Sequence, residues 1–392
     1  MRTIACGFTA NIDLLGKVTP EFYEEIKGCT SGTPKAFIDS WDDFCTALDW
    51  NIRRGSGGEY IVADNSILKK LEGKLDWQRA IGGTGLQAGC AASRAGYRSL
   101  VNIPVQSEEL ERIVSSAGEL ILLSDQNGDV PKHYILEYEI GGSSNRVIFR
   151  RQDEFKADLI ASKFLRELSQ YDVSWLLLSG YNSFDSSAEI DLFLKNNLKI
   201  LESLDSRRLR SHLELAAIWS LEEQWKIIKT LGEHVDSLGV NEDEFQELLG
   251  MNDSLLNLDN DQLLSVMEKA CDLLGVANFI LHTKQFSLVQ SEKYDTSIWG
   301  KALENGNKLA FSRALKGTIC DQATIEHLTA RCDFHKRGEE LRKLTQNRRD
   351  ITVIPAYVGE ITSTIGLGDT FTAGLLVEAP VEFVPNRKIS LG

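Results

Sequence analysis

Short apolar runs alternate along the chain with longer amphipathic segments. The runs that have the length of buried strands are residues 3–8, 101–105, 175–178, 213–217, 235–240, 279–282 and 351–354. Between them, residues 221–231 and 262–274 place apolar positions at helical spacing. This alternation predicts an α/β fold with a central, mostly parallel sheet and helices on both faces.

Two regions break this rhythm. Residues 14–79 have mixed polar patterning, and residues 123–159 contain alternating runs at 133–140 and 146–150. A Gly-Gly-Ser-Ser sequence at 141–144 joins the two runs, so we predict a β-hairpin with a flexible loop. The periodicity by itself indicates only that both regions differ from the main sheet.

Residues 366–369 read Gly-Leu-Gly-Asp and precede a short helical pattern that ends before Pro380. Gly366 and Gly368 allow close backbone approach to a ligand, and the N–H groups that follow Leu367 favour an anion at the helix start. Asp369 stays ionised at such a place and can accept a proton from a hydroxyl group. An anion cradle beside a base predicts phosphoryl transfer to an alcohol. The alternative is an ordinary turn in which Asp369 caps the helix.

Two further polar stretches are expected near the same edge of the sheet. Residues 212–214 read His-Leu-Glu and residues 241–244 read Asn-Glu-Asp-Glu, each at or near the end of a predicted strand. Ligands of parallel sheets collect at the carboxyl ends of strands, so these stretches and 366–369 should converge on one crevice. A carboxylate within an apolar strand, as at Glu214, is costly to bury unless it is paired or near a metal. His212 as a satisfied buried histidine and Glu244 as a solvated helix-start residue remain the alternatives.

These stretches occur in the order typical of one kinase family. With the glycine-rich loop at 82–89, residues 366–369 resemble the paired signatures of the ribokinase-like carbohydrate kinases. The His-x-Glu and Asn-x-x-Glu stretches resemble those of the ADP-dependent glucokinase and phosphofructokinase family, and the segments that extend this resemblance are residues 7–13, 133–138, 145–149, 178–182 and 282–283. The resemblance implies a ribokinase-like large nucleotide-binding domain, made of residues 1–13, 80–122 and 160–392. Residues 14–79 and 123–159 would then form a lid over the sugar site.

The resemblance also implies the roles of individual residues. ADP would be the phosphoryl donor, with Glu214 and Glu244 organising Mg²⁺ or another divalent cation. The nucleotide-binding residues would be Asn241, His282, Thr283 and Leu367, and the sugar-binding residues Asn11, Asp13, Gly82 and Gly83.

Asn11 and Asp13 are expected to end the first strand, where their spacing places both side chains on one side of an extended segment. A turn made by these two residues is the alternative. The chain departs from the family at Thr9, where Asn is common, and in the 84–87 loop, which lacks one glycine.

The choice of acceptor rests on the lid residues. Glu59, within a Gly-Gly-Glu-Tyr sequence, resembles the glutamate that contacts unphosphorylated sugar in the glucokinases, and from it we predict glucose as the preferred acceptor. The basic residues that would instead hold a sugar phosphate, as in an ADP-dependent 6-phosphofructokinase, are Lys132, Arg146, Arg150 and Arg151. A solvated lid edge accounts equally for these charges. An ATP-dependent ribokinase-like sugar kinase and a non-catalytic sugar or nucleotide sensor are the further alternatives.

Composition removes several other classes. The formal net charge of −14 and pI near 5.0 disfavour binding to nucleic acid. Seven cysteines without a C-x-x-C pair argue against structural zinc and a disulfide framework. No apolar run approaches the roughly 18 residues of a membrane span, and the N-terminus does not read as a secretory leader. We therefore expect a cytoplasmic enzyme that acts on small molecules, with an oligomeric state that the sequence leaves unknown.

Overall fold

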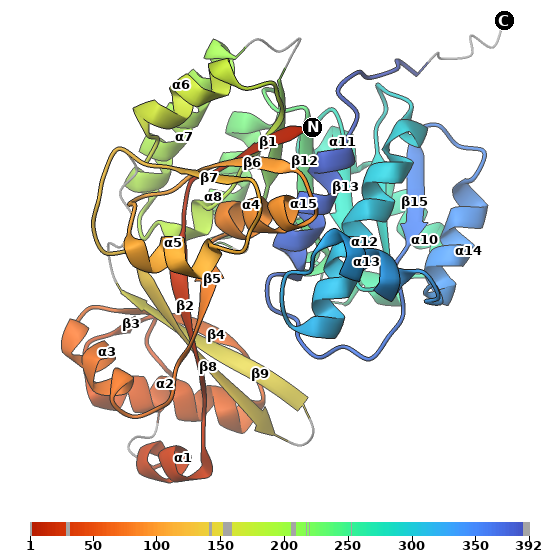
Figure 1. The fold of residues 1–392 in the computed structure, drawn as a ribbon. Helices are drawn as coiled ribbons and strands as arrows, with labels where there is room; N and C mark the ends of the chain where they lie inside the picture. Colours follow the sequence, from red (N-terminus) through yellow and green to blue (C-terminus); the bar gives the residue numbers. More distant parts are fainter. Residues whose placement is uncertain are drawn as a thin grey trace, which may run out of the picture.

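The computed structural model describes residues 2–28, 32–140, 143–151, 159–204, 209–216, 218, 220–251 and 253–386. This part of the chain contains a nine-stranded sheet and a six-stranded sheet (Figure 1). In spatial order, the nine strands are β15 (Ile351–Pro355), β14 (Phe286–Gln290), β13 (Phe279–His282), β12 (Ser237–Asn241), β11 (Arg210–Glu214), β10 (Val173–Leu178), β1 (Thr3–Cys6), β6 (Arg98–Asn102) and β7 (Leu120–Leu123). Strand β14 runs antiparallel to both neighbours, and the other pairings are parallel.

Both faces of the large sheet are buried. Along β10, Trp175 and Leu177 point into one hydrophobic core, and Leu176 and Leu178 point into another. Alternate residues of a strand face opposite sides, so a continuous apolar run fits a strand covered twice. The predicted α/β fold class is confirmed.

Helices supply the two covering layers. The helices and 3₁₀ turns of the large sheet are α4 (Thr84–Arg94), α5 (Glu108–Val114), α6 (Ser162–Gln170), η1 (Tyr181–Ser183), α7 (Ser187–Ser203), α8 (Leu221–Leu231), α9 (Glu242–Leu249), η2 (Leu255–Asn257), α10 (Asn260–Met267), α11 (Ala270–Leu274), η3 (Thr296–Trp299), α12 (Gly300–Lys316), α13 (Gln322–Thr329), α14 (Lys336–Thr345) and α15 (Leu367–Glu378). The first core is covered by α4, α12 and α15, and the second by α6 to α11 (Figure 1).

The small sheet forms the lower part of the molecule in Figure 1. In spatial order its strands are β3 (Phe37–Ile38), β4 (Gly58–Val62), β9 (Ser143–Arg151), β8 (Lys132–Ile140), β2 (Asn11–Lys17) and β5 (Gln78–Gly82), and the helices beside them are α1 (Pro20–Ile26), α2 (Trp41–Arg54) and α3 (Asn65–Glu72). Strands β8 and β9 form the predicted antiparallel hairpin, although Gly141 and Gly142 lie outside the described residues. The sheet takes strands from both regions that break the sequence rhythm. The division into two domains remains a prediction, and its boundaries after residues 13 and 79 fall inside β2 and β5.

Two whole strands lie three residues earlier than the apolar pattern predicted. The runs at 101–105 and 213–217 correspond to β6 at 98–102 and β11 at 210–214, and residue 217 lies outside the description. Both strands begin with polar residues, so a search for apolar runs does not detect where they start. In β11, Nη1 of Arg210 donates to Asp236 at 3.0 Å and Nδ1 of His212 lies 2.8 Å from Oγ of Ser237. These pairings satisfy polar groups that a hydropathy pattern reads as breaks.

The predicted helix at 262–274 is two helices. Helix α10 ends at Met267 and α11 begins at Ala270, with the exposed Glu268 and Lys269 between them. The apolar spacing continues across the break because Met267 and Ala270 are both buried.

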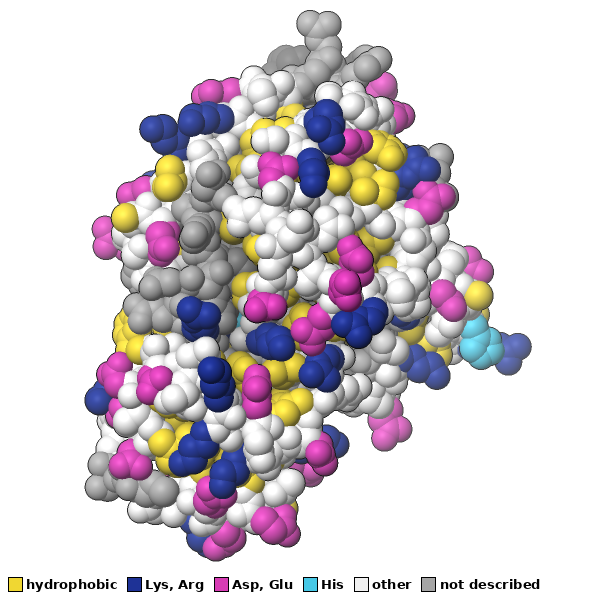
Figure 2. Space-filling model, turned by 60° about the vertical axis from the view of Figure 1, so that its left-hand side comes forward, with side chains coloured by type: hydrophobic (Ala, Val, Ile, Leu, Met, Phe, Trp, Pro, Cys, Tyr) yellow, Lys and Arg dark blue, Asp and Glu magenta, His cyan; other side chains and the backbone are white. Residues whose placement is uncertain are grey.

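Surface charge is mixed on the face drawn in Figure 2, where Lys and Arg side chains lie among Asp and Glu. The helices of the described chain are all too short or too polar to span a lipid bilayer.

Candidate active site

A cavity of about 260 Å³ lies where the two sheets meet. The small sheet contributes Asn11, Asp13, Glu59, His133, Ile135, Arg146, Ile148 and Arg150. The large-sheet side contributes Thr9, Gly83, Thr84, Gln87, Asn182, Ser183, Ile365, Gly366 and Asp369. Both predicted sugar residues of the first segment therefore share one cavity with the predicted base.

The glycine turn before α15 has the geometry expected of an anion cradle. Gly366 has φ 64° and ψ 24°, the left-handed conformation that favours glycine, and it caps the helix without a side-chain hydrogen bond. The backbone N–H groups of the first helical turn are therefore open to a ligand. Asp369 lies in that turn but does not cap the helix. Burial raises the pKa of Asp369, and the positive charge of Arg313 and a hydrogen bond from Thr84 oppose that rise.

Asn11 and Asp13 begin β2 and do not end the first strand, because β1 stops at Cys6. Nδ2 of Asn11 donates to Oδ1 of Asp13 at 2.6 Å, as expected for side chains on one face of a strand. Burial raises the pKa of Asp13 to about 6, although the charge of His133 and the Asn11 hydrogen bond oppose it. A turn made by these two residues is thus wrong.

Glycines make room for this pair. Gly82 faces Asn11 in the β2–β5 ladder, and a Cβ atom there would lie 2.2 Å from Nδ2 of Asn11 and 2.3 Å from Oδ1 of Asp13. Gly83 has φ 86° and its Cβ would lie 2.5 Å from the Thr9 carbonyl oxygen. Of the two, Gly83 lines the cavity. Backbone contacts from either glycine to a sugar remain a prediction.

Glu214 is held between two histidines. Its Oε2 lies 2.9 Å from Nε2 of His212, and its Oε1 lies 2.9 Å from Nε2 of His282. Burial by itself would raise the pKa of Glu214, but the two histidine hydrogen bonds outweigh it and bring the pKa to about 2. Burial by itself would lower the pKa of His282, but the hydrogen bond to Glu214 and the charges of Glu214, Glu244 and Glu242 together raise it. Glu214 is therefore a fixed negative charge beneath α15.

Asn241 and Glu244 form a capping box at the start of α9. Oδ1 of Asn241 accepts from the backbone N–H groups of Asp243 and Glu244, each at 2.9 Å, and Oε2 of Glu244 accepts from the Asn241 N–H at 2.9 Å. Burial and the charge of Glu214 raise the pKa of Glu244 to about 8. No group of three His, Cys, Asp or Glu residues among the described positions is arranged to hold a metal ion. The metal role of the two glutamates stays a prediction.

Thr283 follows His282 in the chain, and Leu367 precedes the glycine that lies against the His282 ring. Oγ1 of Thr283 accepts from the N–H groups of Gln285 and Phe286, so it shapes the β13–β14 turn. Leu367 begins α15, and a Cβ at the next residue, Gly368, would lie 3.4 Å from Cε1 of His282. The glycine turn therefore packs directly against the Glu214–His282 pair.

The small-sheet wall of the cavity carries two arginines on one face of β9. Nε of Arg150 donates to Oε1 of Glu59 at 2.9 Å, and its Nη2 lies 2.6 Å from Oδ1 of Asp185. Nη1 of Arg150 is buried and has no hydrogen-bond partner within the described chain. Arg146, four residues earlier, makes no ion pair with any described residue. This wall therefore offers N–H donors to an anion.

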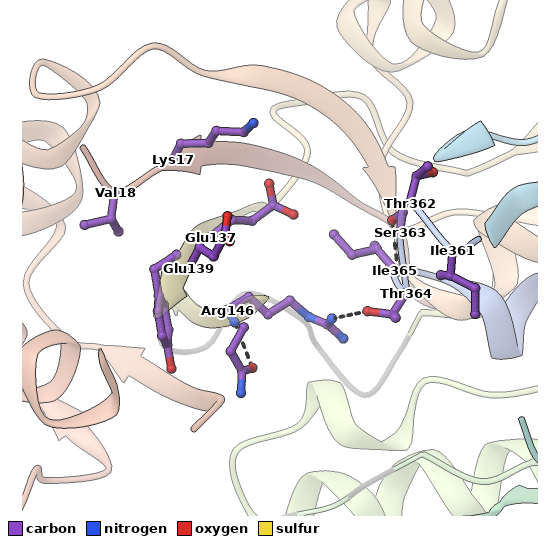
Figure 3. A pocket seen from close by; sticks show the side chains of 12 residues that line it. Lys17, Val18, Glu137, Glu139, Arg146, Ile361, Thr362, Ser363, Thr364 and Ile365 are labelled. Carbon is purple, nitrogen blue, oxygen red and sulfur yellow. Dashed lines mark hydrogen bonds between the residues drawn. The ribbon is translucent and has the colours of Figure 1, made fainter. Parts of the chain in front are cut away.

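A second cavity of about 520 Å³ adjoins the first and shares Arg146 and Ile365 with it. Figure 3 shows Lys17, Glu137 and Glu139 of the small sheet on one side and residues 361–365 on the other. The Arg146 side chain points across it, and its Nη1 donates to Oγ1 of Thr364 at 3.4 Å. Arg146 thus links the β8–β9 hairpin to the segment that leads into α15.

Sequence reasoning missed Arg313, on α12. Its guanidinium donates to Oε1 of Gln87 and to the carbonyl oxygen of Gly366, beneath the glycine turn. An arginine among apolar residues of a helix was the available signal, since such a charge is buried only when paired.

One family description, the ADP-specific Phosphofructokinase/Glucokinase conserved region, matches residues 2–378. The chain belongs to this family. Curated relatives include the ADP-specific phosphofructokinases of Pyrococcus abyssi, 25% identical over 242 residues, and Thermococcus zilligii, 28% identical over 239 residues. These alignments cover 55% and 54% of this chain and 52% and 50% of the relatives. This family member therefore spans about half the length of the curated relatives it matches.

Solved structures show the same fold for the family member over nearly its whole length. A hypothetical ADP-dependent phosphofructokinase from Pyrococcus horikoshii superposes with a TM-score of 0.75 at 20% identity, covering 96% of this chain and 97% of that one. An ADP-dependent kinase in complex with fructose-6-phosphate and ADPbetaS gives a TM-score of 0.75 at 18% identity, covering 96% and 93%.

Proposed function

We propose that the chain is an ADP-dependent sugar kinase whose acceptor is a phosphorylated sugar, with fructose 6-phosphate as the first candidate. The observation that carries this proposal is the placement of Asp369, at the open start of α15, in the same cavity as Asn11 and Asp13. Family membership and the names of the relatives support the donor and the acceptor.

The chemistry follows from the two walls of the cavity. Asn11 and Asp13 form hydrogen bonds with sugar hydroxyls, both as donors and as acceptors. These bonds orient one hydroxyl toward Asp369. The hydroxyl proton passes to Asp369 as its oxygen bonds to the β-phosphorus of ADP. The bond from that phosphorus to the bridging oxygen breaks, so AMP leaves with that oxygen. The N–H groups after Gly366 stabilise the charge on the transferred group.

Glu214 and Glu244, which do not themselves line the cavity, are the carboxylates that a divalent cation would bind. Glu214 stays ionised, whereas Glu244 is held protonated near neutral pH by burial and by the charge of Glu214. Two buried carboxyl groups close together repel each other when both are ionised. A bound cation would relieve this repulsion and allow both to be charged. Glu214 and Glu244 would hold Mg²⁺ directly or through water, and the ion would neutralise charge on the diphosphate.

The preference for glucose is not supported. Glu59 does line the cavity, but Arg150 binds its carboxylate, so its charge is already compensated. The relatives are named as phosphofructokinases, and Arg146 offers an unpaired cation at the same wall. These observations favour the phosphofructokinase alternative.

A coupled assay tests the proposal with four substrate pairs: ADP or ATP as donor, and glucose or fructose 6-phosphate as acceptor, each with Mg²⁺. We expect the highest kcat/KM with ADP and fructose 6-phosphate, and AMP as the second product. A higher kcat/KM with ATP for both acceptors would overturn the donor assignment. Sugar or nucleotide binding without any turnover would favour the sensor alternative.

A further inference from the structure

Arg313 makes three hydrogen bonds from beneath the glycine turn. Its Nη1 donates to the carbonyl oxygen of Gly366 at 2.9 Å and to Oγ1 of Thr370 at 2.8 Å, and its Nη2 donates to Oε1 of Gln87 at 2.5 Å. Arg313 is only 7% exposed. A single buried guanidinium therefore joins α12 to the first turn of α15 and to α4, the helix that follows the sugar-side glycine loop.

The turn itself is shaped around this contact. A Cβ atom at Gly366 would lie 2.2 Å from Oε1 of Gln87 and 2.3 Å from Nη2 of Arg313. Glycine is therefore needed at position 366 both for its positive φ and to leave space for the Gln87–Arg313 pair. The N–H groups that form the anion cradle begin directly after this residue.

The charges around Asp369 come from several elements. Arg313 on α12 and His282 on β13 are positive or proton-donating, and Thr84 on α4 supplies a hydrogen bond. The carboxyl groups whose ionisation is coupled to that of Asp369 are Glu214 on β11, Glu244 on α9 and Asp13 on β2. Across the cavity lie Glu59, His133, Arg146 and Arg150. Arg313 is the strongest of the groups that oppose the effect of burial on Asp369.

We propose that Arg313 is a positioning residue of the phosphoryl transfer, which fixes the glycine turn against Gln87 and places a positive charge behind the helix start that carries Asp369. This inference rests on the proposed function, since it assigns Asp369 the role of base. Arg313 does not line the cavity and acts through Gly366, Gln87 and Asp369.

Two substitutions separate the geometric effect from the charge effect. Arg313→Lys keeps the charge but cannot reproduce the three-way contact, so kcat should fall about 10-fold or more while the acidic limb of the kcat/KM profile stays in place. Arg313→Met removes both, so kcat should fall further and the acidic limb should move to higher pH by on the order of one unit. The direction follows because loss of a nearby cation raises the pKa of a carboxylate.

Arg348→Met is the matched control. Arg348 forms ion pairs with Glu268 and Asp350 just before β15, at the end of the sheet where β13 begins, whereas His282 lies at the other end of β13. This variant should lose stability without a change in the pH limb. An Arg313→Met limb that coincides with that of the native chain, or an Arg313→Lys variant with native kcat, would overturn the proposal.

A measurement that does not depend on kinase activity tests the role of Arg313 separately from the proposed function. Chains labelled with ¹³Cγ-aspartate are titrated by NMR, and the Asp369 signal is identified by its absence in Asp369→Asn. We expect the Asp369 midpoint to move to higher pH in Arg313→Met and to stay near the native value in Arg313→Lys. If the native chain shows no kinase activity but the midpoint moves, the proposed function fails while the electrostatic role of Arg313 stands. An unmoved midpoint overturns that role in an active or inactive chain.

Discussion

Arg150 and Glu59 form an ion pair between the neighbouring strands β9 and β4 of the small sheet, with Nε of the arginine 2.9 Å from Oε1 of the glutamate. Glu59 is 44% exposed at its side chain, whereas Arg150 is 4% exposed. The pair therefore presents a carboxylate to the cavity while its partner stays buried, and the balance of charge at this wall depends on both residues.

Glu59→Ala should change acceptor choice. Without the carboxylate, Arg150 loses one partner and the wall becomes more positive, which favours a phosphorylated sugar and removes an acceptor for a free hydroxyl. We expect the ratio of kcat/KM for fructose 6-phosphate to kcat/KM for glucose to rise by about 10-fold, the scale of a lost polar contact. Both values are measured at saturating Mg·ADP. An unchanged ratio would show that Glu59 does not face the acceptor.

Arg146→Gln should weaken use of a phosphorylated acceptor. The substitution removes the cation that lines both cavities and its hydrogen bond to Thr364. We expect kcat/KM for fructose 6-phosphate to fall by about 10-fold to 100-fold, with a smaller effect on glucose. Arg151→Gln, five residues along the same strand and outside the cavity lining, is the control. Equal losses in both variants would contradict a direct role for Arg146.

Gly82→Ala should damage the sugar wall. The added Cβ would collide with the Asn11 and Asp13 side chains, at 2.2 Å and 2.3 Å, and would break the bond between them. We expect the acceptor KM to rise by about 10-fold or more, because displaced hydroxyl ligands lose their alignment. Gly300→Ala is the control, since nothing lies within 4 Å of a Cβ there. A native KM in Gly82→Ala would mean that Asn11 and Asp13 do not bind the acceptor.

The sequence predicted the parts of the site that lie at strand or helix ends. Asp369 follows a glycine turn at a helix start, and Glu214 interrupts an apolar strand, so each has a local signature. The signature of Arg313, a charge among the apolar residues of a helix, does not indicate its partners. Its partners are Gln87, 226 residues away, and the backbone of Gly366, and only the packing of α15 between α12 and α4 brings them together.

The ion pair between Glu59 and Arg150 was also not predictable from the sequence, because its partners are distant along the chain. Glu59 and Arg150 are 91 residues apart, and their pairing depends on the parallel register of β4 with β9. A one-residue change of register would turn one of them to the other face of the sheet. The predicted preference for glucose is not supported, because that prediction took Glu59 to be a carboxylate without an ionic partner.

Asp13→Asn should stabilise the chain at neutral pH and not at acidic pH. The pKa of Asp13 is raised from 3.8 to about 6 in the folded chain, so the folded state favours the protonated form. The stability that the protonated Asp13 contributes is fully present below about pH 4. It is lost as the pH rises through about 6, because the folded chain must then bury a charged Asp13, at a cost of at most about 3 kcal/mol. Asn keeps an acceptor for the Asn11 amide. Urea unfolding midpoints of both chains at about pH 4.5 and pH 8 check this, and a pH-independent difference would contradict it.

The central claim is that Asp369 removes the proton from the acceptor hydroxyl. The most direct test is the rate of AMP formation by Asp369→Asn with saturating Mg·ADP and fructose 6-phosphate, together with ADP affinity by calorimetry. Asp261→Asn, also in the first turn of a helix but on α10, is the control. We predict that Asp369→Asn lowers kcat by at least about 10²-fold and changes ADP affinity only a few-fold, because the base is lost while the glycine turn remains. A kcat within a few-fold of the native chain would contradict the account.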